Sequence, residues 1–244
     1  MMQGLRLEMI RFLFGIYYYM YTLVCGVEDQ GHDGSSRTRL YVILAHRNKT
    51  VKLVDPFKVY CAISKAIRCH VCTKPSDYMI STEVEIQQMY SELASVRKKG
   101  VKRVLDSDFT RLLSERELDC LQGARSEYVK RFKKNPEDDD DLLVFLGDTF
   151  SKRQTWSGVS RRIPTFRTGG GLMWWFAAQR PMTPRERLAT LAFPVSSGYA
   201  DSMSVPELPC RDSKRAASIA GNSMSFATVM IVQLVALVSF KQTN

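Results

Sequence analysis

At 244 residues, the chain has room for one mid-sized domain or two small ones. Hydrophobic residues make up 45% and charged residues 25%, proportions that exclude a disordered or fibrous chain. No apolar run reaches the roughly 18 residues of a membrane-spanning helix, which excludes a polytopic membrane protein. Lys and Arg number 35 against 25 Asp and Glu, and the net charge of +10 favours a polyanionic partner, nucleic acid first.

The N-terminal segment, residues 1–27, is apolar, and its role is open. Residues 12–27 carry no charge and follow Arg6 and Arg11, an arrangement found in signal peptides and membrane anchors. Four tyrosines make this stretch polar for such a signal, and a buried strand or helix explains it equally. We expect an intracellular protein of the nucleus or cytoplasm, with membrane anchoring through residues 12–27 as the competing interpretation.

Residues 28–148 are expected to form a mixed α/β region. The runs 40–44 and 142–146 are apolar and short, as is typical of buried strands. Two capping boxes, Thr82 with Glu85 and Ser114 with Glu117, predict helices near 82–99 and 114–134. Apolar residues then recur at helical spacing, so each helix should bury one face.

The six cysteines are too sparse for a disulfide framework in a chain of this length. Cys69 and Cys72 have the spacing of half a zinc site, with Cys61 and His70 nearby. No second ligand pair follows at a suitable distance. We therefore predict no metal site, and buried reduced thiols instead.

The region 149–182 is basic and rich in tryptophan, and the basic segment extends from Lys152 to Arg187. It holds eight Lys or Arg residues, one acidic residue, Glu186, and all three tryptophans. Arginines contact phosphates and aromatic rings stack on bases, which is typical of a nucleic-acid interface. A solvated basic face above an aromatic core explains the same composition equally well.

The C-terminal segment, residues 183–244, contains two predicted helices. Thr183, Pro184 and Glu186 together form a helix start, with a cap, a first-turn proline and a capping-box acid. Residues 226–240 are free of charge but short for a membrane span, which predicts a buried core helix. Gly221 and Asn222 precede this helix, where backbone amides can hold a ligand.

In this order, the segments resemble the C-terminal part of the C5-cytosine DNA methyltransferases. The residues that carry the resemblance lie between about 160 and 240. In chain order they are Pro164, Thr165, Arg167, Thr168 and 169–171; Arg180, Thr183, Arg185 and Glu186; 191–194, with Ala192 where the family usually has glycine; and 221–224. The resemblance implies a mixed α/β fold, part of a class I (Rossmann-like) methyltransferase, whose last helix packs on a sheet from the N-terminal half.

The resemblance also implies roles for individual residues. Those expected at the DNA are Arg161, Arg162, Thr165, Arg167 and Thr168, the first two on the phosphate backbone. Thr183, Arg185 and Glu186 would organise the recognition region against the catalytic lobe. Asn222, after Gly221, would lie beside the cofactor S-adenosylmethionine.

The family's catalytic motifs do not occur in their places in this sequence. The family attacks cytosine with a cysteine in a Pro-Cys loop and holds the base with the carboxylate of a Glu-Asn-Val motif. Here Pro-Cys occurs once, at Pro209–Cys210 between two later motifs, and Glu-Asn-Val does not occur. We therefore predict no catalytic residue.

Two functions remain open from the sequence. The first is an incomplete methyltransferase-like protein, inactive alone, that binds DNA and needs a separate chain for its catalytic lobe. The alternative is a non-enzymatic DNA-binding or chromatin-associated module that uses residues 152–187.

Overall fold

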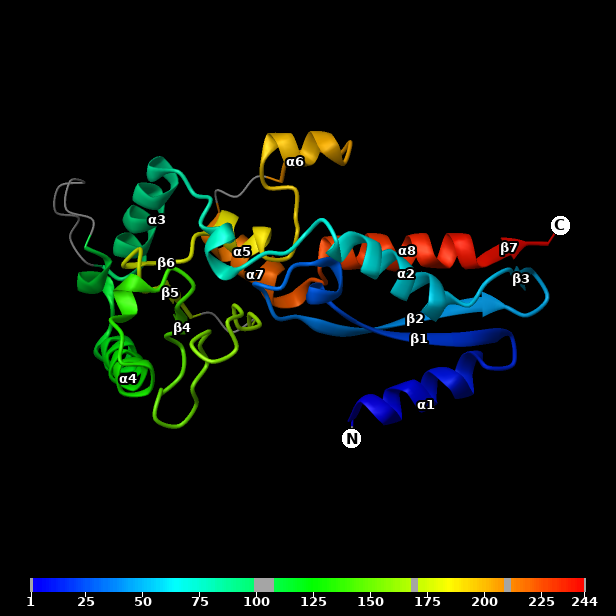
Figure 1. The fold of residues 1–244 in the computed structure, drawn as a ribbon, viewed down its shortest axis with the longest axis horizontal. Helices are drawn as coiled ribbons and strands as arrows, with labels where there is room; N and C mark the ends of the chain where they lie inside the picture. The colour runs from blue at the N-terminus through cyan, green and yellow to red at the C-terminus, as the bar shows by residue number, and fades with distance from the viewer. Residues whose placement is uncertain (1, 99–107, 168–170, 209–211, 244) are drawn as a thin grey trace.

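The computed structural model describes residues 2–98, 108–167, 171–208 and 212–243 (Figure 1). The protein is mixed α/β and elongated, with a β-hairpin at one end and a smaller sheet with α3 and α4 at the other. The helices are α1 (Met2–Phe14), α2 (Pro56–Arg68), α3 (Glu83–Val96), α4 (Glu115–Phe132), α5 (Pro184–Ala189), α6 (Ser197–Ser202), α7 (Ser213–Asn222) and α8 (Phe226–Ser239). The strands are β1 (Tyr18–Gly26), β2 (Thr38–His46), β3 (Thr50–Lys52), β4 (Leu143–Phe145), β5 (Met173–Trp175), β6 (Arg180–Pro181) and β7 (Phe240–Gln242).

The strands of the described residues form three small antiparallel sheets: β1–β2, β3–β7 and β4–β5–β6. Within the same residues, the one parallel pairing is the isolated bridge between Ser35 and Ile163. The prediction of a mixed α/β protein is confirmed. The parallel, Rossmann-like sheet is not present in the described part of the chain.

The β1–β2 hairpin carries the first hydrophobic core. Leu23 and Ile43 lie on one face of the hairpin and pack against Tyr60 of α2 and Val235 of α8. The expected packing of the last helix on a sheet from the N-terminal half is thus observed, on two antiparallel strands. Residues 12–27, for which we expected one buried strand or helix, are divided between the end of α1, a turn and β1.

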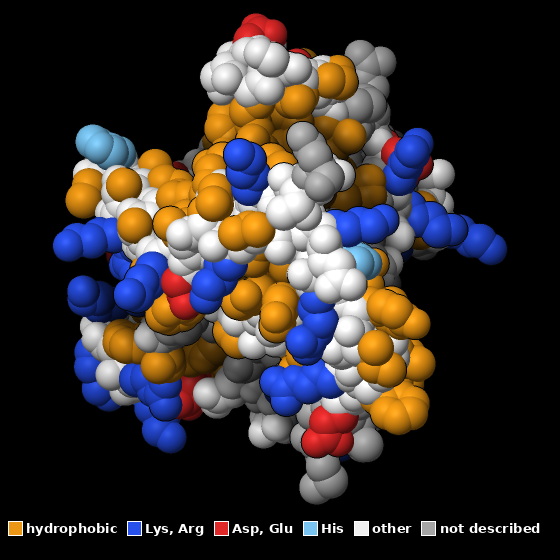
Figure 2. Space-filling view, turned by 90° about the vertical axis from the view of Figure 1, so that its right-hand side faces the viewer, with side chains coloured by type: hydrophobic (Ala, Val, Ile, Leu, Met, Phe, Trp, Pro, Cys, Tyr) orange, Lys and Arg blue, Asp and Glu red, His pale blue; other side chains and the backbone are white. Residues whose placement is uncertain are grey.

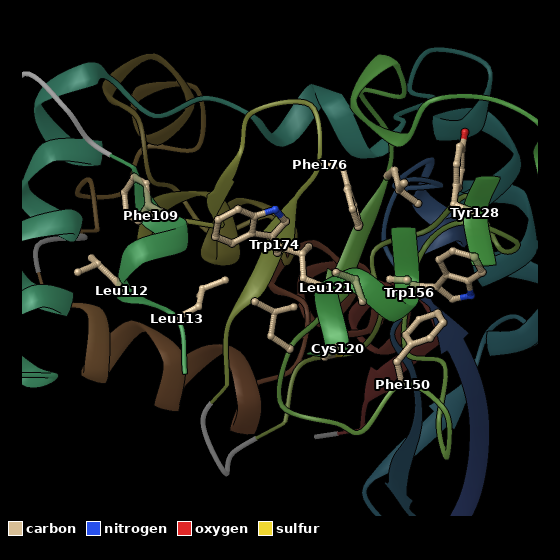
Figure 3. Close-up of a cluster of buried hydrophobic side chains, with 14 of the residues drawn as sticks. Phe109, Leu112, Leu113, Cys120, Leu121, Tyr128, Phe150, Trp156, Trp174 and Phe176 are labelled. Atoms are coloured by element: carbon tan, nitrogen blue, oxygen red, sulfur yellow. The ribbon is translucent and has the colours of Figure 1, made fainter. Parts of the chain in front are cut away.

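The second core lies between α3, α4 and the three-stranded sheet (Figure 3). Trp174 of β5 is fully buried there, beside Phe176, Leu121 and Cys120. Trp175 is fully buried in an adjoining cluster, and Trp156 is 7% exposed. The three tryptophans are therefore core residues, and the interpretation of the aromatic residues as a core beneath a basic segment is the correct one for them.

The two capping boxes at 82 and 114 are confirmed, because each begins a helix that buries one face. The backbone N–H of Thr82 donates to Glu85 at 2.9 Å, and that of Ser114 donates to Glu117 at 2.8 Å. Glu117 also accepts a hydrogen bond at 2.8 Å from Arg97 just after α3, so its carboxylate joins the two helices. Helix α3 ends at Val96, three residues before the expected end.

The Glu117 carboxylate should make the protein acid-sensitive. Burial alone would raise its pKa, but hydrogen bonds from Arg97 and Ser114 outweigh burial and lower the pKa to about 2. Because the folded-state pKa lies below the unfolded one, the contribution is complete above about pH 4.5 and disappears as the pH falls through 2. We expect Glu117→Gln to remove on the order of 2–3 kcal/mol of pH-dependent stability across this window. Urea unfolding of both proteins from pH 6 to 2 measures it; parallel curves would contradict the prediction.

Helix α8 follows the predicted charge-free stretch closely. Within the described residues, one stretch, Lys214–Ser239, has the length and apolar composition of a membrane span. The outer face of α8 is exposed, with Leu234 at 47% and Leu237 at 76%, so the expected core helix is buried on one face only. Ile231, Val232 and Val235 in this stretch face the hairpin core.

Candidate nucleic-acid interface

A polar hollow of about 490 Å³ lies in the loops between β4 and β5. It is lined by Ser36, Arg153, Gln154, Thr155, Trp156, Ser160, Arg162, Pro164, Thr165, Phe166 and Arg167, and we call it the arginine hollow. Three of the five residues predicted to contact DNA, Arg162, Thr165 and Arg167, thus line one surface. Arg161 does not line it, and Thr168 lies outside the described residues.

Backbone pairing to distant segments holds the loops of the hollow in place. Val144 of β4 bridges to Trp156, and the Ser157 hydroxyl accepts from the Leu143 N–H at 2.8 Å. At the other end, the Ile163 N–H donates to the carbonyl of Gly34 at 2.8 Å. The Thr165 hydroxyl donates to the Ser36 carbonyl, which fixes its side chain on the rim.

Arg167 is held by Asp148, the residue that follows the predicted strand 142–146 and a glycine. Its guanidinium donates to both carboxylate oxygens, at 2.7 and 2.9 Å, and lies 5.0 Å from the centre of the Phe145 ring. The Thr155 hydroxyl donates to the same carboxylate at 2.6 Å. Hydrogen bonds from Arg167 and Thr155 hold the pKa of Asp148 below its usual value, so the pair is charged at neutral pH. Arg153 approaches Asp148 at 3.9 Å.

Arg162 and Arg161 are neighbours in sequence but pair with different parts of the chain. Arg162 lies 3.3 Å from Glu28 and 3.9 Å from Asp33, near the end of the hairpin. Arg161 donates to Asp139 and to Asp141, the latter at 3.0 Å. Hydrogen bonding to Asp139 raises the pKa of Arg161 above its ordinary value. The acidic run 137–141 therefore neutralises part of the basic segment.

The basic segment between Lys152 and Arg187 is largely paired with carboxylates. Six of the eight basic residues form ion pairs with carboxylates: Arg153, Arg161, Arg162, Arg167, Arg180 and Arg185. The acidic partners come from segments up to about 130 residues away, which local charge counting does not include. A phosphate that binds here must displace carboxylates and not only counterions.

Glu186 and Arg180 form a buried pair beneath the helix start at 183. The guanidinium of Arg180 donates to both carboxylate oxygens, at 2.9 and 2.6 Å, and the Trp175 indole N–H donates at 3.3 Å. The Thr183 N–H donates to the same carboxylate at 3.0 Å, so the predicted capping box is confirmed. Glu186 is fully buried, and the hydrogen bonds to its carboxylate connect β5 and β6 to α5.

Arg185 connects the same helix start to other elements. Its guanidinium lies 2.9 Å from Glu85, the capping residue of α3, and 3.5 Å from Glu207. Thr183, Arg185 and Glu186 therefore join residues from the region 149–182, the region 28–148 and the C-terminal segment.

Sequence reasoning missed Arg37, which lies beneath Gly221 and Asn222. Arg37 is 2% exposed and donates to the carbonyls of Ala220 at 3.0 Å, Gly221 at 3.3 Å and Ser223. Burial lowers the pKa of its guanidinium to about 10. Nothing in the local sequence around residue 37 distinguishes it from an exposed arginine.

The residues around Asn222 do not by themselves fit a pocket for S-adenosylmethionine. Asn222 is exposed at the end of α7 and does not line the arginine hollow. Two N–H groups in the first turn of α8 already have partners, because Phe226 donates to the carbonyl of Leu191 and Thr228 donates to the Ser225 hydroxyl. We derive no chemical step through this cofactor.

The five cysteines within the described residues differ in burial. Cys61, Cys69 and Cys72 are exposed and Cys25 and Cys120 are buried, so the expectation of buried thiols holds for two of these five. No group of three or more His, Cys, Asp or Glu side chains in this part of the chain could hold a metal ion. Cys210 lies outside the described residues.

A second hollow of about 1160 Å³ is apolar and lies between α3, α5 and α7. Met89, Leu93, Leu172, Met182 and Ala217 are among its lining residues.

Comparisons of the sequence with protein-family models and with curated proteins find no match.

Proposed function

We propose that the chain is the target-recognition and C-terminal portion of a C5-cytosine DNA methyltransferase-like protein. It binds DNA but transfers no methyl group alone, and a separate chain supplies the catalytic lobe. The observation that carries the proposal is the arginine hollow, which gathers Arg162, Thr165 and Arg167 on one surface. The joined motif at Thr183, Arg185 and Glu186, which the resemblance assigns to organising the recognition region, supports it further.

The hollow has the chemistry of a phosphate site. Guanidinium groups of Arg153, Arg162 and Arg167 line it, and their side chains are 68%, 38% and 35% exposed. Serine and threonine hydroxyls between them are the other groups that commonly contact DNA phosphates. Because the tryptophans are buried, base stacking on them has no part in the proposal.

DNA affinity should depend on salt through these three arginines. If each contacts one phosphate, the slope of log K against log salt concentration is roughly −3. We expect Arg162→Ala with Arg167→Ala to flatten that slope by about two units, because two phosphate contacts are lost. Fluorescence anisotropy with a cytosine-containing duplex, from 50 to 300 mM salt, measures it.

Two control variants make this test specific. Arg161→Ala should leave the slope unchanged, because Arg161 pairs with Asp139 and Asp141 and does not line the hollow. Asp148→Asn should strengthen binding several-fold, because it releases Arg167 from a competing carboxylate. Absence of DNA binding at 50 mM salt, or equal effects of all these variants, would refute the proposed interface.

The purified chain should be catalytically silent. It lacks a Glu-Asn-Val carboxylate, and Pro209–Cys210 is its one Pro-Cys pair. Incubation with tritiated S-adenosylmethionine and cytosine-containing DNA should give labelling no higher than a no-protein control. Labelling that disappears in Cys210→Ala would show that the chain catalyses the reaction unaided.

A further inference from the structure

The β1–β2 hairpin has two unpaired edges. Two hydrogen bonds close the ends of the hairpin and fix which pairs are hydrogen-bonded. The Arg47 N–H donates to the Tyr17 carbonyl at 2.9 Å, and the Val27 N–H donates to the Arg37 carbonyl at 3.3 Å. Hydrogen-bonded pairs alternate in an antiparallel ladder, so the N–H and C=O groups of Thr22 and Val42 point away from the partner strand. No other described strand pairs with β1 or β2. The outward groups of Gly26, Thr38 and His46 already have partners, which leaves the middle of each edge, residues 20–24 and 40–44, available for pairing.

The same residues carry the open face of the hairpin. The side chains alternate, and those opposite the α2–α8 core form the cross-strand pairs Met20–Leu44, Thr22–Val42 and Val24–Leu40. Val24 is 68% exposed and Leu44 37%. One face of this two-stranded sheet is packed against α2 and α8, whereas the other is apolar and uncovered, so an added chain that covers it would bury apolar area.

The charges beside this surface are nearly all positive. In residues 2–24 and 40–54 the basic residues are Arg6, Arg11, Arg47, Lys49 and Lys52, and the one acidic residue is Glu8. Figure 2 shows hydrophobic side chains interspersed with Lys and Arg over the end of the molecule at the right of Figure 1. Two copies of this surface would repel each other, whereas acidic groups would be attracted.

We infer that a free edge and the open face of the β1–β2 hairpin dock an extended strand of a second protein chain with acidic flanking residues. A strand edge requires N–H and C=O partners, which lipid tails do not offer and another strand does. The inference rests on the proposed function, since the chain that carries the catalytic lobe is the partner expected there.

The test uses the full chain and a synthetic peptide, Glu-Glu-Val-Thr-Val-Thr-Val-Glu-Glu with a fluorescent label. Thr22→Pro and Val42→Pro each remove one outward N–H and keep the hydrogen bonds within the hairpin. Thr22→Val is the matched control, because it keeps that N–H. We expect the peptide to bind, one proline variant to bind it at least tenfold more weakly, and Thr22→Val to be unchanged. A peptide with lysines in place of its glutamates should bind at least tenfold more weakly.

Several outcomes would overturn the inference. They are no binding of the acidic peptide, equal binding by both proline variants and wild type, or equal binding of the lysine peptide, each with folding verified by circular dichroism. Self-association in sedimentation that a proline variant abolishes would assign the surface to a second copy. Pelleting with phosphatidylserine vesicles that neither proline variant changes would assign it to lipid. DNA binding is measured on the same samples. If the protein binds DNA but not the acidic peptide, the docking inference fails and the proposed function does not.

Discussion

Glu186→Gln should lower the free energy of unfolding by about 3–5 kcal/mol, because it leaves a buried guanidinium without its counter-charge. Arg180 is 7% exposed and Glu186 is fully buried, so water cannot replace the lost charge. The carboxylate also accepts from Trp175 and Thr183, and an amide cannot serve all these donors. Urea denaturation monitored by tryptophan fluorescence measures the change.

The matched control for this prediction is Glu127→Gln on α4. Glu127 lies 3.8 Å from Arg131, one helical turn along an exposed face, and such pairs contribute about 0.5 kcal/mol. Replacing both partners of the buried pair, with Arg180→Met and Glu186→Leu, should cost less than Glu186→Gln alone. If Glu186→Gln and Glu127→Gln gave equal losses, Glu186 would not be the buried anchor described here.

Arg37→Met should destabilise the protein by about 3 kcal/mol, the second large effect. The side chain keeps its length but loses its donors, and the carbonyls of Ala220, Gly221 and Ser223 lose a common partner. Thermal unfolding followed by circular dichroism measures the loss.

Arg39→Met in β2, two residues further along the chain, is the control for Arg37→Met. Arg39 donates to the neighbouring Thr38 carbonyl at an exposed position, so we expect a change under about 1 kcal/mol. A similar small change for Arg37→Met would mean that the end of α7 does not depend on this contact.

The predictable parts of the fold were those encoded by neighbouring residues. Capping boxes at Thr82, Ser114 and Thr183 act over three residues, and they correctly marked the starts of α3, α4 and α5. The charge-free stretch predicted α8 because a continuous apolar run cannot remain fully solvated.

The contacts that build the candidate site join residues far apart in the chain. Arg37 donates hydrogen bonds to the end of α7, more than 180 residues away in the sequence, and Arg161 pairs with Asp139, 22 residues away. Charge counting within a window cannot find such partners, so it located the arginine-rich segment but not the carboxylates that pair with it. The resemblance to the methyltransferases depends on motif order, and it stays a prediction that the proposed experiments test.

The pairing of Arg167 with Asp148 would couple the proposed DNA binding to proton uptake. While Arg167 donates to Asp148, the pKa of this carboxyl is held down. When the guanidinium turns to a phosphate, the carboxyl loses its main stabilising partner, and its pKa rises towards the ordinary aspartate value. If the hollow binds phosphate as proposed, the bound state holds more protons than the free state once the pH falls to about 4, so acid in that range strengthens binding through this hollow and proton uptake accompanies it.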